Sequence, residues 1–116
     1  MLLNTQMYST GIGKTGLESL IRDLGPRKVT GLLKITFDAC DGIIILDRGV
    51  VIDSYEIFNE LLVKDRNGYH IKERYRIEPG KIDIFEVQPE VLHTFIKMLQ
   101  ENPPQNLQTL FHLFMQ

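Results

Sequence analysis

Residues 9–16, STGIGKTG, are the first stretch with a recognisable chemistry, because Gly-Lys-Thr ends the loops that cradle nucleotide phosphates. Such a loop also needs a glycine five residues before its Gly-Lys pair, and Tyr8 stands there. The loop must follow a buried strand, whereas MLLNTQ (1–6) contains at most three apolar residues. The sequence therefore favours Thr15 as the cap of a helix over a nucleotide site.

IIILD (43–47) resembles a strand that ends in a magnesium-binding carboxylate. Arg-Gly follows it at once, however, and leads into a further apolar run, VVIDSYEI (50–57). This spacing predicts an antiparallel hairpin in which Gly49 supplies a positive φ and Asp47 marks the corner. The βαβ units of nucleotide-hydrolysing folds are also missing from the pattern. We expect no nucleotide cofactor.

The sequence contains a single cysteine, Cys40, so no disulfide can form within the chain. Cys40 stands in a polar turn between Asp38 and Asp41. A nearby carboxylate raises the pKa of a thiol and disfavours the reactive thiolate. We therefore predict an inert thiol at the surface.

The three histidines, His70, His93 and His112, are far apart in the sequence, and no pair has the i,i+4 spacing of two ligands on one helix. DACDG (38–42) lacks the ligand spacing of a calcium loop. No paired carboxylates or serine–histidine arrangement indicates catalysis. The sequence thus predicts no metal, no cofactor and no enzymatic activity.

Basic residues gather between positions 64 and 76. If 69–77 is a strand, every second residue, from His70 to Arg76, lies on the face opposite Tyr69, Ile71, Tyr75 and Ile77. Such a stripe could bind phosphates of nucleic acid or another anion, or could be a solvated face that discourages edge-to-edge pairing. The candidate anion-binding residues are Lys64, Arg66, His70, Lys72, Arg74 and Arg76.

The segment 38–60 is acidic by contrast, with six carboxylates against Arg48 alone. An acidic half and a basic half can attract each other between molecules, which favours self-association or a charged protein partner. Apolar residues of the C-terminal segment either close the core or pack against another subunit. The candidate self-association residues are Leu107, Leu110, Phe111 and Phe114.

Hydrophobic periodicity predicts the elements that carry these residues. A capping box of Thr15 and Glu18 begins a helix over 17–24, which Gly25 ends in the left-handed conformation before Pro26. Alternation and turn residues predict strands near 29–37, 42–47, 50–57, 69–77 and 81–87, and 56–64 is ambiguous, with helix favoured weakly. Two helices follow, one from Pro89 and one containing Leu107–Phe114.

The size and composition are those of one ordinary globular domain, 1–116. The chain has 43% hydrophobic and 24% charged residues and a net charge of −2. Neither a signal peptide nor an apolar run long enough for a bilayer is present. We expect a soluble cytoplasmic protein without a membrane partner.

LESLIRDLGPRKVTGLLKITFDACDGIIILDRGVVIDSYE (17–56) resembles the PATAN-type domain, named for the N-terminal region of cyanobacterial PatA response regulators, and its archaeal relatives of unknown function. Thr30, Gly31, Leu33 and Ile35 match its first strand, and 43–46 and 49–51 match the second and third. The resemblance covers roughly 17–99 and implies a non-enzymatic signalling or adaptor module that binds other proteins. The hairpin also shares the style of roadblock-type regulatory domains.

Together these patterns predict an α+β fold: an antiparallel four- to five-stranded meander sheet, an N-terminal helix and two C-terminal helices on one face. The predicted function is a non-enzymatic intracellular regulatory or adaptor module that mediates protein–protein interaction by self-association. Nucleic-acid or anionic-ligand binding through residues 64–76 is the alternative.

Overall fold

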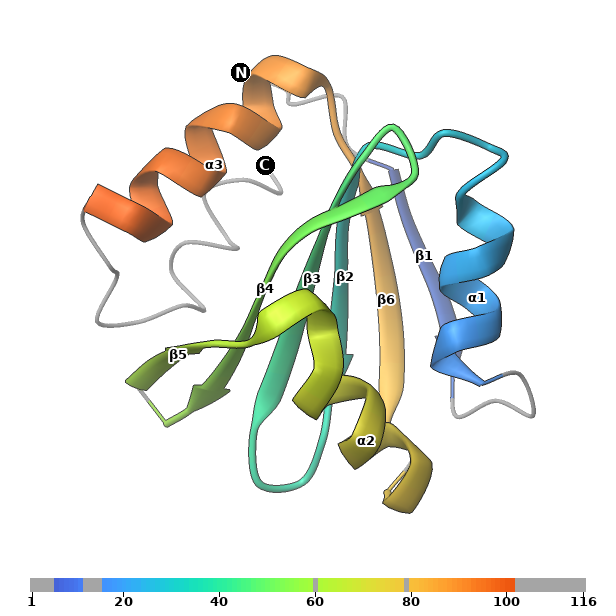
Figure 1. Ribbon diagram of the computed structural model, residues 1–116, viewed down its shortest axis with the longest axis vertical. Coiled ribbons are helices and arrows are strands. Elements are labelled where there is room, and N and C mark those ends of the chain that lie inside the picture. The colour runs from blue at the N-terminus through green and yellow to red at the C-terminus, as the bar shows by residue number, and fades with distance from the viewer. Residues whose placement is uncertain (1–5, 12–15, 60, 79, 102–116) are drawn as a thin grey trace.

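The computed structural model describes residues 6–11, 16–59, 61–78 and 80–101, which form one antiparallel sheet with helices on both faces (Figure 1). The strands are β1 (Gln6–Gly11), β2 (Gly31–Thr36), β3 (Asp41–Asp47), β4 (Val50–Phe58), β5 (Leu61–Lys64) and β6 (Lys81–Glu86). The helices are α1 (Leu17–Leu24), the 3₁₀ turn η1 (Arg66–Gly68), α2 (Tyr69–Ile77) and α3 (Pro89–Glu101). None of the helices in these ranges is long and apolar enough to cross a membrane.

The strand order is β1-β6-β2-β3-β4-β5. β2 to β4 form the predicted meander of consecutive neighbours, and β5 extends it by one strand. The chain then crosses through α2 to place β6 on the other side of β2. The predicted α+β class, the antiparallel sheet, the N-terminal helix and two helices in the C-terminal half are confirmed. The sheet has six strands because β1, which the sequence pattern did not predict, pairs with β6.

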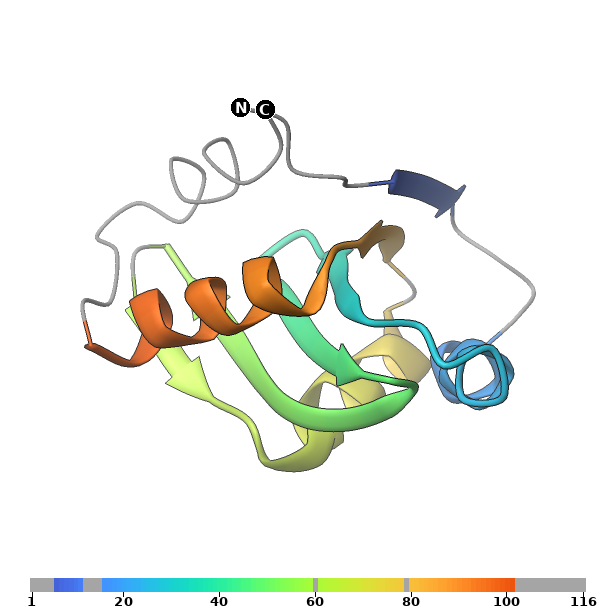
Figure 2. The same cartoon turned by 90° about the horizontal axis from the view of Figure 1, so that it is seen from above.

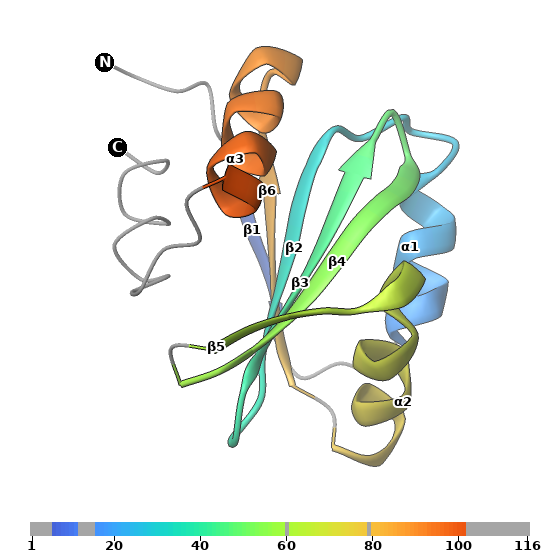
Figure 3. The ribbon, with the colours of Figure 1, turned by 60° about the vertical axis from the view of Figure 1, so that its left-hand side comes forward.

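The sheet has a separate apolar core on each face. Leu17 and Leu24 of α1 and Ile71 and Tyr75 of α2 pack on one face, whereas Leu92, Phe95 and Leu99 of α3 pack on the other. Figures 2 and 3 show α3 on the opposite side of the sheet from α1 and α2. The predicted helix from Pro89 is α3, and the second predicted C-terminal helix, containing Leu107–Phe114, lies outside the described residues. Both faces of the central strands are apolar, so each needs a cover.

β3 is the central strand of this arrangement, as its continuous apolar run predicts. Ile44 and Leu46 belong to the core beneath α1 and α2, and Ile43 and Ile45 to the core beneath α3. Asp47 pairs with Val50 across an antiparallel turn. Asp47 is thus the corner of a hairpin, as predicted.

The turn after β3 has the geometry that its sequence predicts. Arg48 and Gly49 both adopt positive φ, at 49° and 84°. A bulge in β4 follows, where the register shifts between Ile45 and Leu46. Positive φ at both central residues matches the twist of the flanking strands, so the local sequence determines this hairpin.

The weakly favoured helix over 56–64 is wrong, because β4 continues to Phe58 and β5 begins at Leu61. Asn59 adopts φ 57° between them, and Phe58 pairs directly with Leu61. Asparagine tolerates this left-handed conformation better than most residues, so a tight turn replaces the helix.

The limits of α1 agree with the prediction, but its two caps differ. Gly16 holds the N-cap position without a side-chain hydrogen bond, and Thr15 lies outside the described residues. Gly25 is right-handed at φ −57°, since its N–H still donates to the Ile21 carbonyl in the helical pattern. Lys28, at φ 52°, takes the positive φ instead.

Cys40 lies inside the protein, so the prediction of a surface thiol is wrong. Only 6% of the residue is exposed, and it packs with the core beneath α1 and α2. Burial is the largest cause that raises the pKa of this thiol, and the Arg74 charge opposes it. The polar neighbours of Cys40 in the sequence did not reveal that its own side chain points inward.

Burial and the raised pKa both suppress thiolate formation, so we expect slow alkylation of native Cys40. At pH 8 the rate should be at least about tenfold below that of the urea-unfolded chain, corrected with a free thiol in the same two solvents. Equal corrected rates in the folded and unfolded protein would contradict the buried position.

Candidate functional site

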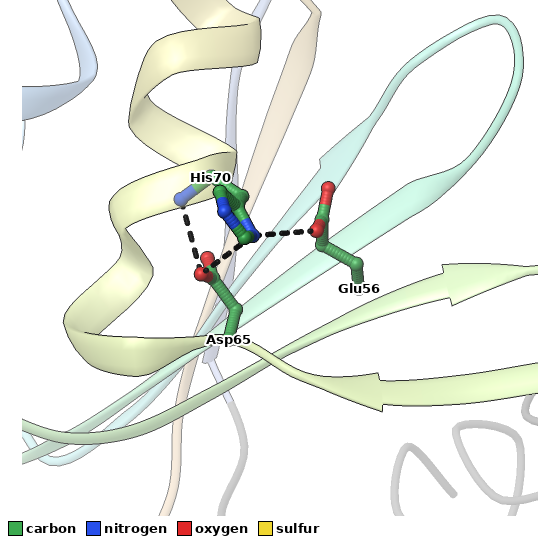
Figure 4. Close-up of side chains that lie close together, drawn as sticks. All are labelled: Glu56, Asp65 and His70. Carbon is green, nitrogen blue, oxygen red and sulfur yellow. Dashed lines mark hydrogen bonds and ion pairs between the residues drawn. The ribbon is translucent and has the colours of Figure 1, made fainter.

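Three side chains that can bind metals or transfer protons converge where β4 faces the start of α2. These are Glu56 from β4, Asp65 from the loop after β5, and His70 from the first turn of α2 (Figure 4). One potential ligand atom from each lies within 4.8 Å of the other two. Both carboxylates are buried, and the imidazole is 66% exposed.

The segment that carries His70 is a helix, so the predicted strand over 69–77 is wrong. Asp65 begins this helix with its carboxylate. Its Oδ1 accepts a hydrogen bond from the His70 N–H at 3.0 Å, and its Oδ2 accepts one from the Ile71 N–H at 3.1 Å. These backbone donors have no partner inside the helix, so the buried acceptor stabilises its first turn.

Ser54 holds the loop before the helix against β4. Its hydroxyl donates to the Asp65 carbonyl and accepts a hydrogen bond from the Gly68 N–H at 2.7 Å. The Asp65 N–H donates in turn to the Ser54 carbonyl at 2.8 Å. Asn67 and Gly68 adopt φ values of 53° and 72°, which reverse the chain between Asp65 and the helix.

The apolar residues of α2 follow helical rather than strand spacing. Ile71 and Tyr75, four residues apart, are buried against the sheet, whereas Tyr69 and Ile77 are exposed. Both periods fit a nine-residue segment, because positions i and i+4 share a face in a helix and also in a strand. The buried acceptor at Asp65 decides between them.

Glu56 has its two carboxylate oxygens directed to different partners. Oε1 lies 3.5 Å from Nδ1 of His70, and Oε2 lies 3.5 Å from Nε of Arg74. The Arg74 guanidinium also stacks over the rings of Phe58 and Phe37, with distances to the centroids of 5.5 and 5.9 Å. A buried carboxylate needs an opposite charge nearby, because burial removes it from water. Arg74 supplies this charge at Oε2 of Glu56, and Oε1 faces His70.

Two open pockets meet at His70. One, of about 420 Å³, is lined by Glu56 and Arg74, and the other, of about 550 Å³, by Asp65 and Arg66. His70 lines both. The carboxylates are therefore buried among protein atoms yet lie beside space that a small ligand can enter.

The predicted anion-binding residues do not form the stripe that a strand would create. Four of the six candidate side chains lie within 3.4 to 3.7 Å of a carboxylate oxygen: Lys64 with Asp53, His70 and Arg74 with Glu56, and Arg76 with Glu73. The helix distributes its four basic residues around its axis, because successive residues are about 100° apart.

The other predicted site residues are separate from this cluster or outside the described part of the chain. His93 is exposed on α3. Lys14 and Thr15 of the glycine-rich segment, His112, and all four self-association candidates lie outside the described residues.

Sequence reasoning missed Glu56 and Asp65 as site residues. Asp65 had a usable signal, since an aspartate shortly before an amphipathic segment is typical of a helix cap. No sequence signal pointed to Glu56, because its side chain is buried only when α2 packs against β4.

Comparison with family models, with curated proteins and with solved structures finds no match for this chain. Evidence for the function therefore comes from the chain's own exposed residues and from the cluster of Glu56, Asp65 and His70.

Proposed function

We propose that this chain is a non-enzymatic intracellular regulatory or adaptor module that self-associates through the edge strand β5. One observation carries the proposal: among the described strands β5 ends the order of the sheet, and it exposes two large apolar side chains on one face. Leu61 is 63% and Val63 37% exposed. The resemblance of 17–99 to the PATAN-type domain supports the same class of function.

A free strand edge offers unpaired N–H and C=O groups to another strand. Two antiparallel copies of β5 can satisfy these groups around a two-fold axis, which joins both sheets into one. Leu61 and Val63 then lie beside their symmetry mates, so pairing buries apolar surface as well as making backbone hydrogen bonds.

The charge on β5 is compatible with a second copy of the same strand. Lysine on an edge strand usually prevents pairing by repulsion. Here Lys64 is the one charged residue of β5, and its ammonium lies 3.7 Å from Oδ1 of Asp53 on β4. This carboxylate offsets the charge that would otherwise repel the partner strand.

Replacing Leu61 with lysine is expected to weaken self-association. The new charge would lie in the apolar contact, so the dimer dissociation constant should rise at least about tenfold. Val50→Lys is the matched control, because Val50 is also 63% exposed but lies at the far end of the β3–β4 hairpin. Sedimentation equilibrium of both variants and of the wild type measures the effect.

A wild type that stays monomeric at about 1 mM would refute the proposal, because a dissociation constant above this value means a binding free energy of less than about 4 kcal/mol. Equal weakening by both lysine substitutions would refute the role of β5. Dimerisation that survives Leu61→Lys but is lost in Phe111→Lys would assign the interface to the C-terminal segment.

A further inference from the structure

We propose that Glu56, Asp65 and His70 form a zinc-binding site. The inference stands independently of self-association through β5, because it rests on the distances, donors and surroundings of these three side chains. The sequence did not predict this site, because Glu56, Asp65 and His70 do not have the spacing of a known metal-binding motif along the chain.

The spacing of the donor atoms fits a tetrahedral ion. Nδ1 of His70 lies 3.5 Å from Oε1 of Glu56 and 3.5 Å from Oδ1 of Asp65. Zinc binds nitrogen and carboxylate oxygen at about 2.0–2.2 Å, and the edge of a tetrahedron of that size is about 3.4 Å. One potential ligand atom from each of the three residues lies within 4.8 Å of the other two, so binding an ion requires the side chains to draw closer together.

The type of donor favours zinc over magnesium or calcium. One imidazole with two carboxylates is a mixed nitrogen and oxygen set, which suits zinc, whereas magnesium and calcium prefer oxygen alone. An octahedral magnesium ion with bonds of about 2.1 Å would need neighbouring donors about 3.0 Å apart, closer than those seen here.

Each carboxylate is held in place by protein groups that leave a lone pair available on one of its oxygens. Arg74 binds Oε2 of Glu56, so Oε1 remains directed to the imidazole. Asp65 is fixed by the His70 and Ile71 N–H groups, and its Oδ1 keeps a second lone pair. Such supporting hydrogen bonds orient metal ligands and are typical of metal sites.

The two pockets beside the cluster let a cation reach it, and the charges that line them attract a cation. The exposed His70 lines two open pockets, and Glu73 lines both as well. Glu56, Glu73 and Glu78 line the smaller pocket together with Arg74. Across both pockets five carboxylates stand against three cationic side chains, Arg66, Lys72 and Arg74, and this excess favours a divalent cation over an anion. Water can supply the fourth ligand from the open side.

The test is titration of the full chain, free of any histidine tag, with Zn²⁺ in a calorimeter and with Co²⁺ in an absorption cell. We expect one equivalent of Zn²⁺ with a dissociation constant below about 10 μM. Co²⁺ should give the intense visible bands of a four-coordinate ion. His70→Ala should weaken binding at least about 30-fold, and Glu56→Gln at least about tenfold.

His70→Ala should remain folded, because the side chain is mostly exposed and the backbone N–H that Asp65 accepts is retained. Its melting temperature in EDTA verifies this. His93→Ala, an exposed histidine on α3, is the matched control and should change the affinity less than about twofold. No zinc binding at 1 mM, or equal losses in His70→Ala and His93→Ala, would overturn the proposal.

Discussion

Replacing Gly31 with alanine is expected to abolish folding at 25 °C. An added Cβ would lie 1.8 Å from the Phe85 carbonyl oxygen, which belongs to the backbone of the neighbouring strand. Gly31 also adopts φ 156°, a conformation that residues with a side chain rarely occupy. We expect a loss of more than about 4 kcal/mol in the free energy of unfolding, a large part of the total for a small domain.

The clash cannot be relieved by a side-chain rotation. Gly31 pairs with Glu86 on β6 and with Leu46 on β3, so a shift away from Phe85 breaks a central ladder. Far-UV circular dichroism and urea unfolding measure the effect. Gly25→Ala is the control, because Gly25 is right-handed and a Cβ there would meet nothing nearer than 3.5 Å.

Gly25→Ala should change the stability by no more than about 1 kcal/mol, because alanine restricts the unfolded chain, whereas its Cβ disfavours the right-handed conformation before Pro26. If Gly31→Ala unfolded at the same urea concentration as the wild type, the close approach of β2 to β6 would be contradicted.

Replacing Asp65 with alanine is the second substitution with a large expected effect. It leaves the N–H groups of His70 and Ile71, in the first turn of α2, without their buried acceptor. Charged acceptors and helix caps of this kind contribute about 2–4 kcal/mol together. Urea unfolding in EDTA measures this loss separately from any metal effect.

Two comparisons test the capping role of Asp65. Asp65→Asn keeps one acceptor oxygen and should lose less stability than Asp65→Ala. Asp23→Ala removes an exposed carboxylate from α1 and should change the stability by no more than about 0.5 kcal/mol. An Asp65→Ala protein as stable as the Asp23→Ala protein would show that the carboxylate does not fix the helix.

Predictions from the sequence are accurate where the decisive interactions are local. The apolar stripe from Leu17 to Leu24 defines α1, and the two-residue turn at Arg48 and Gly49 defines the hairpin of β3 and β4. The unbroken apolar run of β3 predicts burial on both faces, as observed. Each of these signals depends on neighbours a few residues apart.

Predictions fail where partners distant in the sequence decide. The pattern of 69–77 fits a strand as well as a helix, and Asp65 and the Ser54 hydroxyl select the helix. β1 has too little apolar sequence to be predicted, and it is a strand because the edge of β6 pairs with it. Strand pairing through the backbone is largely independent of side-chain pattern.

The candidate site shows the same division. The sequence by itself determined that His70 and the nearby basic residues lie together in the chain, and that Cys40 cannot form a disulfide within it. The tertiary structure alone decided that Glu56 is buried beside His70 and that Cys40 points into the core. The physical reason is that periodicity and turn residues specify local conformation, whereas burial of a polar group depends on which surface packs over it.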